Sequence, residues 1–196
     1  FTTHNLPGID NRIIYALFTS HDGKIWIGTD EGITYYIPEQ KTFFSYSAKN
    51  ATVQDTQGKK HPFWKKLKVK SFTEDKYGNI YIGTWSKSLY RLNPKRHIFY
   101  QYDIPTVAGT GNTYLLKMDS KGRLWISTWG NGIKCMTQPL NQQNPGLIDL
   151  HHGDSRYAIN YSLAEDVVSH TLWACSRSGC GVISTDNIQE GFTYYN

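Results

Sequence analysis

The chain has 196 residues, of which 39% are hydrophobic, 14% are aromatic and only 19% are charged. This length and composition allow a buried core and argue against intrinsic disorder, and no stretch approaches the ~18 consecutive apolar residues that a membrane-spanning helix needs. The formal net charge is +5. Because the lysine runs at 59–60 and 65–68 are short and no nucleic-acid motif accompanies them, we expect no nucleic acid to bind through this region.

One sequence pattern recurs four times along the chain. Each copy combines an apolar segment, a turn with Asp or Gly, a segment of the type Trp-Ile-Gly-Thr and another short apolar segment. The copies cover residues 18–33, 72–92, 117–133 and 164–183, with anchor aromatics Trp26, Tyr81, Trp125 and Trp173. The anchors are separated by 55, 44 and 48 residues. Several short strands in a period of this length are typical of β-propeller blades.

Each period is predicted to form four strands, which we call A to D in chain order. The expected blades cover residues of about 12–46, 68–102, 113–150 and 157–196. The anchor aromatics should fill the wedges between neighbouring blades, and the small residue two positions later should let the next blade approach closely. Asp22, Asp75 and Asp119 should cap turn backbone N–H groups. In the fourth copy, residues 167–170 replace the Gly turn, which leaves that turn's geometry open.

The two ends of the chain resemble each other. Residues 1–5 and 192–196 both match the strand D position, so residues 1–6 are interpreted as a blade remnant that precedes four complete blades. We therefore predict an all-β fold, a β-propeller whose four four-stranded blades form an arc of a larger, seven-bladed propeller. A closed four-bladed ring is the alternative. An open arc exposes a flat apolar face, which favours a partner such as a second copy in a homodimer.

Residues 21–29, His-Asp-Gly-Lys-Ile-Trp-Ile-Gly-Thr, followed by Gly32-Ile33, closely resemble the two-component regulator propeller repeat, as do the related segments of the other copies. In that family such repeats form the extracytoplasmic sensor region of hybrid two-component histidine kinases. The resemblance implies a periplasmic fragment of a membrane-anchored sensor that detects a small ligand, an oligosaccharide, and signals to transcription. Its partners would include the remaining blades and the kinase part of the parent chain, and the fragment itself would have no enzymatic activity.

The candidate ligand-binding residues lie where the B–C turns and D–A connections meet. Because successive strands alternate direction, these two kinds of loop emerge at the same end of the fold. Trp85 and Trp129 occupy equivalent positions just after strand B, and we interpret them as surfaces for stacking on a sugar ring; covering the rim of a neighbouring blade is the alternative. The other candidates are Asp30, Lys87, Asn131 and Arg177 in the B–C turns, Arg12 and Arg156 before strand A, and Trp64 in the long connection at 47–67.

No catalytic set, metal site or cofactor motif is recognisable, and we expect no cofactor. Two other function classes stay open: a propeller lyase-type enzyme, which would need His, Arg or a metal converging at the axis, and a protein-interaction scaffold. Cys175 and Cys180 flank the B–C turn of the fourth copy. They could bridge that hairpin in an oxidising compartment or remain free thiols.

Overall fold

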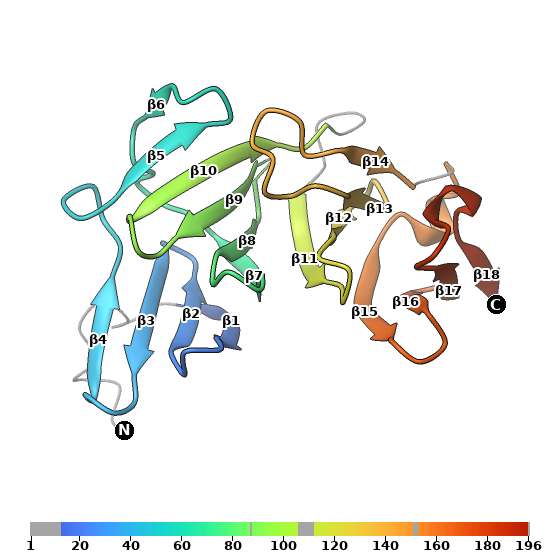
Figure 1. Ribbon diagram of the computed structural model, residues 1–196, viewed down its shortest axis with the longest axis horizontal. Coiled ribbons are helices and arrows are strands. Elements are labelled where there is room, and N and C mark those ends of the chain that lie inside the picture. The colour runs from blue at the N-terminus through green and yellow to red at the C-terminus, as the bar shows by residue number, and fades with distance from the viewer. Residues whose placement is uncertain (1–12, 87, 106–111, 151–152, 196) are drawn as a thin grey trace.

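The computed structural model describes residues 13–86, 88–105, 112–150 and 153–195, and within them the chain folds into four β-sheets that follow one another in sequence (Figure 1). The first sheet contains β1 (Ile14–Thr19), β2 (Ile25–Thr29), β3 (Ile33–Ile37) and β4 (Thr42–Ser45). The second contains β7 (Val69–Glu74), β8 (Ile80–Thr84), β9 (Ser88–Asn93) and β10 (Ile98–Asp103), extended by β5 (Thr52–Asp55) and β6 (Lys60–His61). The third contains β11 (Asn112–Met118), β12 (Leu124–Trp129), β13 (Ile133–Met136) and β14 (Leu147–Asp149). The fourth contains β15 (Asn160–Asp166), β16 (Thr171–Ser176), β17 (Gly179–Ser184) and β18 (Thr193–Tyr195), and short 3-10 helices lie at η3 (Ser155–Tyr157) and η4 (Ile188–Glu190).

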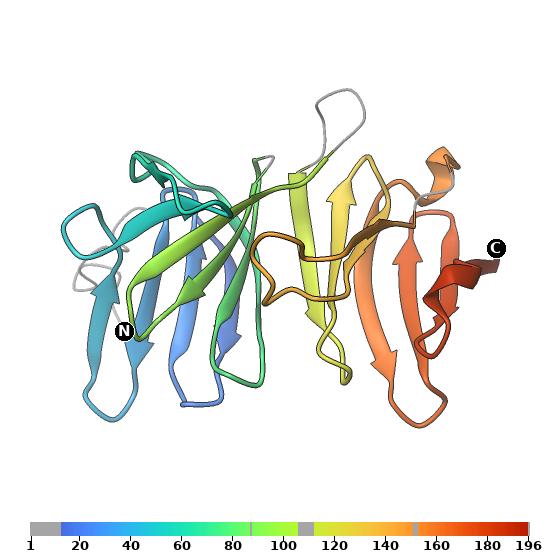
Figure 2. The ribbon, with the colours of Figure 1, turned by 45° about the horizontal axis from the view of Figure 1, so that its top comes forward.

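The four sheets are arranged side by side as an open arc. The first strand of each sheet contacts the first strand of the next, so that β1 lies on β7, β7 on β11 and β11 on β15. The first and fourth sheets lie at opposite ends of the assembly in two views (Figures 1 and 2). The predicted all-β propeller arrangement is therefore confirmed, with strand A innermost. The expected blade remnant at residues 1–6 lies outside the described residues.

Three of the four anchor aromatics fill the wedges between sheets, as predicted. Trp26, Tyr81 and Trp125 are all at most 1% exposed. Trp26 contacts Phe72 of the second sheet, and Trp125 contacts Phe192 of the fourth, each with ring centroids 6.3 Å apart. The polar atom of each anchor donates a hydrogen bond to the A–B turn of its own sheet, for example from Trp125 Nε1 to Asp119 Oδ2 at 2.8 Å.

The prediction is wrong for the fourth anchor, Trp173. Its register matches that of the other anchors, because it pairs with Ala164 as Trp26 pairs with Phe18. Its side chain is nevertheless 40% exposed, and its ring stacks on Tyr195, which is 56% exposed. Each anchor faces the following sheet, and in the described part of the chain no sheet follows the fourth. An apolar surface is therefore left open there.

The second sheet also differs from the prediction of four purely antiparallel strands. The expected strands β7 to β10 are antiparallel, but β5 pairs in parallel with the outer strand β10, and β6 pairs with β5. The long connection at 47–67 thus folds back as a hairpin on the edge of the sheet. Val53 of β5 is 2% exposed, and the pairing satisfies backbone groups that an edge strand would leave open.

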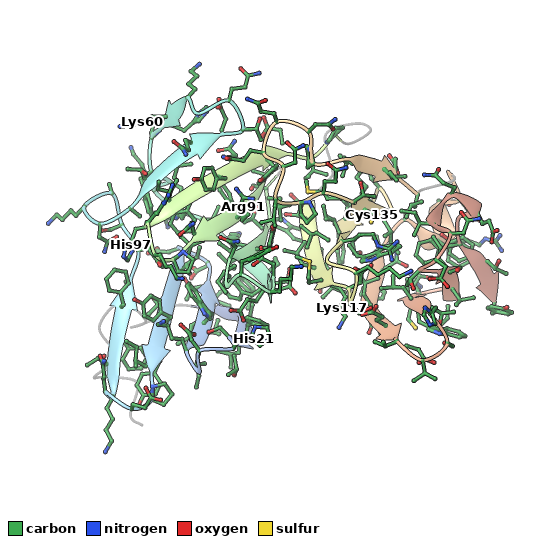
Figure 3. The ribbon with its side chains drawn as sticks, in the orientation of Figure 1. His21, Lys60, Arg91, His97, Lys117 and Cys135 are labelled. Atoms are coloured by element: carbon green, nitrogen blue, oxygen red, sulfur yellow. The ribbon has the colours of Figure 1, made fainter. Side chains whose placement is uncertain are left out.

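Polar contacts join neighbouring sheets at the A–B turn end. The backbone N–H of His21 donates to Glu74 Oε2 at 2.8 Å, and the N–H of Ser120 donates to Glu165 Oε2 at 2.9 Å in the equivalent place. His21 lies at this end in Figure 3. Elsewhere the buried guanidinium of Arg91 donates to the carbonyl of Leu140 at 3.1 Å, which ties the second sheet to the β13–β14 connection (Figure 3).

The aspartates of the A–B turns are structural, as expected. Asp75 Oδ1 accepts the N–H groups of Tyr77 and Asn79, and Asp119 Oδ1 accepts those of Lys121 and Arg123. The fourth turn achieves the same result without glycine. There Asp166 accepts the N–H of Val168, and His170 adopts the left-handed conformation with φ 54°.

The small residue two positions after each anchor permits the close approach of sheets. A Cβ atom at Gly83 would lie 2.4 Å from Ser71 Oγ and 2.9 Å from the backbone oxygen of Thr113 in the next sheet. At Gly28 it would lie 2.6 Å from Val69 Cγ1. Contacts this short are not tolerated, so the neighbouring sheet would have to move.

We expect Gly83→Ala to lower the free energy of unfolding by about 1–3 kcal/mol, since overpacking forces the adjoining sheets apart. The matched control is Cys175→Ala, which changes the equivalent position of the fourth sheet, where the side chain is half-buried and no further sheet is described. Urea unfolding followed by circular dichroism measures both. Equal stability of Gly83→Ala and the unchanged protein would contradict the close-approach argument.

Candidate functional site

The B–C turns and the segments that lead into strand A lie together, as the strand topology predicts. The N–H of Asp30 donates to the carbonyl of Ile13 at 3.1 Å, and the N–H of Trp85 donates to the carbonyl of Lys68 at 2.8 Å. In the third sheet the N–H of Gly130 reaches the carbonyl of Ala158, just before β15, at 3.1 Å. One end of the fold is therefore built from both kinds of loop.

A β-bulge occurs at the same place in the innermost strand of every sheet. The register of β1 with β2 skips from Ile14 to Ala16, and the corresponding skips in β7, β11 and β15 fall between residues 69 and 71, 113 and 115, and 160 and 162. The bulged residues are Tyr15, Lys70, Tyr114 and Tyr161. A bulge turns a side chain away from its regular strand direction.

These bulge residues meet the two predicted tryptophans in one continuous row. The Lys70 ammonium lies 3.4 Å from the Tyr15 ring centroid and 5.3 Å from that of Trp85. The Trp85 and Trp129 ring centroids are 5.2 Å apart at an interplanar angle of 60°. Tyr114 contacts both indoles, with centroids 6.1 and 5.2 Å away, and Tyr161 lies 6.3 Å from Trp129. We call this set the axial row: Tyr15, Lys70, Trp85, Tyr114, Trp129 and Tyr161.

The axial row crosses all four sheets and stays partly open to solvent. Trp85 is 36% exposed and Tyr161 is 49% exposed, while the other members are half-buried. Burial, followed by the charge of Lys68, lowers the pKa of Lys70 from its usual value. Such a set of inclined, accessible rings can stack on apolar C–H faces of a ligand, and the ammonium can donate hydrogen bonds.

The other predicted site residues differ in exposure and in the partners they contact. Asp30 follows strand B as Trp85 does, and its Oδ1 accepts the N–H of Ile13 at 3.2 Å. Arg177 lies exposed in the turn between β16 and β17. Asn131 is only 4% exposed and its N–H donates to Thr128 Oγ1, so it belongs to the interior of its turn. Arg156 pairs with Asp154, with Nη2 2.7 Å from Oδ2. Arg12 and Lys87 lie outside the described residues.

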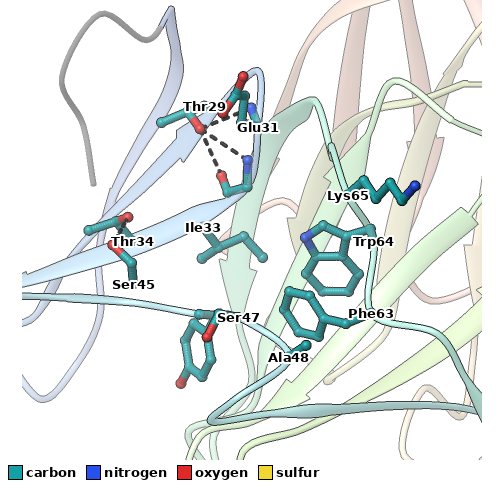
Figure 4. Close-up of a pocket in the computed structure, with 12 residues that line it drawn as sticks. Thr29, Glu31, Ile33, Thr34, Ser45, Ser47, Ala48, Phe63, Trp64 and Lys65 are labelled. Carbon is teal, nitrogen blue, oxygen red and sulfur yellow. Dashed lines mark hydrogen bonds between the residues drawn. The ribbon is translucent and has the colours of Figure 1, made fainter. Parts of the chain in front are cut away.

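Trp64 belongs to a separate pocket at this end of the fold (Figure 4). The pocket has a volume of about 380 Å³ and lies between the first B–C turn and the long connection. The Trp64 ring stacks on Phe63 with centroids 4.2 Å apart and packs edge-on against Phe99 at 4.8 Å, which fixes one wall. Glu31, on the opposite wall, forms an ion pair with Lys66 at 3.3 Å. No ring contact links Trp64 to the described members of the axial row.

Cys175 and Cys180 are direct partners on β16 and β17, and both are free thiols. The neighbouring Cys180 thiol, together with burial, raises the pKa of Cys175. The geometry therefore agrees with the prediction that they flank one hairpin turn, and of the two alternatives this structure has the free thiols.

Sequence reasoning identified the two tryptophans but missed the four bulge residues. A signal was available, because each bulge residue precedes the anchor aromatic of its sheet by eleven or twelve positions. Three of the four are tyrosine. An aromatic repeated at a fixed offset in the apolar strand could be taken for another core residue, and only the bulge directs it out of the sheet.

A family model described as "two component regulator propeller" matches residues 7–31, which include the anchor Trp26. Within these residues the chain is similar to one repeat of that family. The remaining three periods share its sequence pattern, and each forms four successive antiparallel strands in the same order, to which the second sheet adds β5 and β6. A histidine kinase named P4, from Formosa agariphila, is 33% identical over 92 residues. That match covers 45% of this chain but only 6% of the kinase, so the chain spans a small part of that relative's length.

Solved propeller structures share the fold. The extracellular domain of the putative hybrid two-component system BT4673 from B. thetaiotaomicron superimposes with a TM-score of 0.71 and 23% identity, over 93% of this chain and 22% of that one. A streptogramin B lyase superimposes with a TM-score of 0.70 and 16% identity, over 98% and 56% of the two chains. At these identities the likeness shows the propeller fold alone, which the extracellular domain and the lyase share.

The described residues lack two further features. They contain no helix long and apolar enough to cross a membrane. They also contain no group of three or more His, Cys, Asp or Glu side chains that could hold a metal ion.

The exposure of the axial row is open to direct measurement. We expect Trp85→Phe and Trp129→Phe each to remove fluorescence that acrylamide quenches readily, because both indoles contact solvent. Trp125→Phe is the matched control, and it should remove a shielded component because Trp125 is fully buried. Loss of only shielded emission in the Trp85 and Trp129 variants would place these rings between sheets instead.

Proposed function

We propose that this chain is part of the extracytoplasmic sensor region of a hybrid two-component histidine kinase, and that the axial row binds an oligosaccharide. The region would lie in the periplasm, attached to the membrane through other parts of its parent chain. Ligand binding there would be transmitted to the kinase part and on to transcription. In this proposal the chain contributes recognition and has no catalytic activity of its own.

The observation that carries the proposal is the axial row itself. Aromatic rings placed on successive sheets, and left partly exposed, have no role in filling the wedges, because Trp26, Tyr81 and Trp125 already do so. A pyranose ring presents apolar C–H faces that stack well on indoles, and its hydroxyl groups need polar partners at the edge. Asp30 and Arg177, at the first and last sheets, occupy the sequence positions equivalent to the two tryptophans and could supply such partners.

The parent context is supported by three findings. The matched repeat family is named for two-component regulators, and the curated relative is a histidine kinase. The similar extracellular domain from B. thetaiotaomicron belongs to a putative hybrid two-component system, which favours placement outside the cytoplasm.

The open face of the fourth sheet supports a proposal about assembly. Trp173 and Tyr195 stack on each other there and are 40% and 56% exposed. We propose that further blades of a larger, seven-bladed propeller cover this face in the parent protein. A second copy in a homodimer would be the other partner for such a surface.

A propeller lyase is the second candidate function, favoured by the fold shared with the streptogramin B lyase. A lyase of this architecture would need an acid–base group beside the ligand. The axial row offers the Lys70 amine and the phenol groups of its tyrosines, so an elimination with an amine or a phenol as the base is the form this alternative would take. Incubation with an oligosaccharide that yields unsaturated fragments would support the lyase, whereas reversible binding without product supports the sensor.

We expect Trp129→Ala to weaken oligosaccharide binding by about 1–3 kcal/mol, since Trp129 contacts three other members of the row. The matched control is Trp173→Ala, which removes a partly exposed indole from the outer face of the fourth sheet. Isothermal titration of a panel of neutral and acidic oligosaccharides into each variant measures the change. Equal losses in both variants, or no loss in Trp129→Ala, would contradict a ligand role for the row.

A further inference from the structure

One position in the axial row breaks its aromatic pattern. The bulge residues of the first, third and fourth sheets are tyrosines, and that of the second sheet is Lys70. The Lys70 ammonium is held between two rings, 3.4 Å from the centroid of Tyr15 and 5.3 Å from that of Trp85. These contacts give the cation a defined place beside the more exposed of the two tryptophans that the row contains.

Lys70 is half-buried, and its charge is not neutralised by any described carboxylate. Lys24, Lys66, Lys121 and Lys134 each form an ion pair with a carboxylate, but across the described ranges no carboxylate lies at ion-pair distance from Lys70. Burial, followed by the like charge of Lys68, lowers the pKa of Lys70. A partly desolvated cation beside a second cation is stabilised by an incoming anion.

Asp30 is an acidic residue at the same end of the fold as Lys70. It comes directly after strand B in the first sheet, as Trp85 and Trp129 do in the second and third. Lys70 lies in β7, the innermost strand of the second sheet. Asp30 Oδ1 accepts the backbone N–H of Ile13 at 3.2 Å within its own sheet. It forms no ion pair with Lys70. At the opposite end of the row the equivalent residue is Arg177, which is exposed and adds a second positive charge.

We propose that the axial row selects an acidic sugar, whose ring stacks on Trp85 and whose anionic group accepts a hydrogen bond from the Lys70 ammonium. The anionic group could be a ring carboxylate or a sulfate ester, which share the charge and the acceptor oxygens that an ammonium recognises. This inference rests on the proposed function, because it specifies the ligand class of the same site. It adds a requirement for negative charge that the aromatic rings alone do not impose.

The test compares acidic sugars with neutral counterparts of the same shape. Trigalacturonic acid is titrated against its trimethyl ester, and a sulfated galactose disaccharide against its unsulfated parent, with the full protein and with Lys70→Gln. We expect the acidic member of at least one pair to bind more tightly. Lys70→Gln should weaken its binding by about tenfold or more while leaving the neutral member unchanged. The pair that responds identifies the anion as carboxylate or sulfate.

Lys76→Gln is the matched control, because the Lys76 ammonium also lies over a ring, 5.2 Å from the Tyr77 centroid, but in an A–B turn at the far end of the fold. It should leave every affinity unchanged. Equal binding of acidic and neutral sugars, with both weakened by Trp129→Ala, would overturn this inference while supporting an oligosaccharide sensor. A loss in Lys76→Gln as large as that in Lys70→Gln would also overturn it, since net charge would then explain the effect. If none of the four sugars binds, the inference fails, and the wider panel tests the proposed function separately.

Discussion

The close approach of each sheet to the next is the constraint on which both the fold and the candidate site depend. Gly28 contacts Val69, Gly83 lies against Thr113, and Ser127 donates to the carbonyl of Asn160, always at the start of the following innermost strand. The residue after each of these contacts is the bulge residue, Lys70, Tyr114 or Tyr161. The packing that joins two sheets therefore also delivers one side chain to the B–C end of the sheet before it.

The arrangement of the sheets could be predicted from the sequence because the residues that form and join the sheets repeat in each period. Anchor aromatics, small residues and turn aspartates recur at nearly constant spacing within each period. Their positions could be predicted because the first three sheets use them for the same contacts. The β5–β6 hairpin could not, since it occurs once and its pairing with β10 depends on how a long connection folds back in space. The exposure of Trp173 was missed for a related reason. Its local sequence is that of an anchor, but burial of an anchor is decided by the next sheet.

The candidate site was only partly readable. Trp85 and Trp129 stood out because a large aromatic directly after strand B is not needed for the wedge. The bulge residues recur at a nearly fixed offset from the anchors, but that offset alone does not distinguish them from core residues, because a bulge is an irregularity of backbone pairing. Asn131 shows that exposure of a turn residue could not be predicted either. Its polar side chain in a turn suggested a ligand contact, whereas the turn folds around it and leaves it 4% exposed.

Within each repeat, some positions are restricted by the packing of sheets and others are free to vary. At the close-approach position only small residues occur in the three sheets that have a described neighbour. At the bulge position the side chain is Tyr, Lys, Tyr and Tyr, and after strand B it is Asp, Trp, Trp and Arg. Neither of these two positions contributes to the wedge, so substitutions there need not disturb sheet packing. A repeat of this kind can thus present a different chemical surface from each sheet on an unchanged framework. Lys70, the single lysine among the bulge residues, adds a positive charge to an otherwise aromatic row.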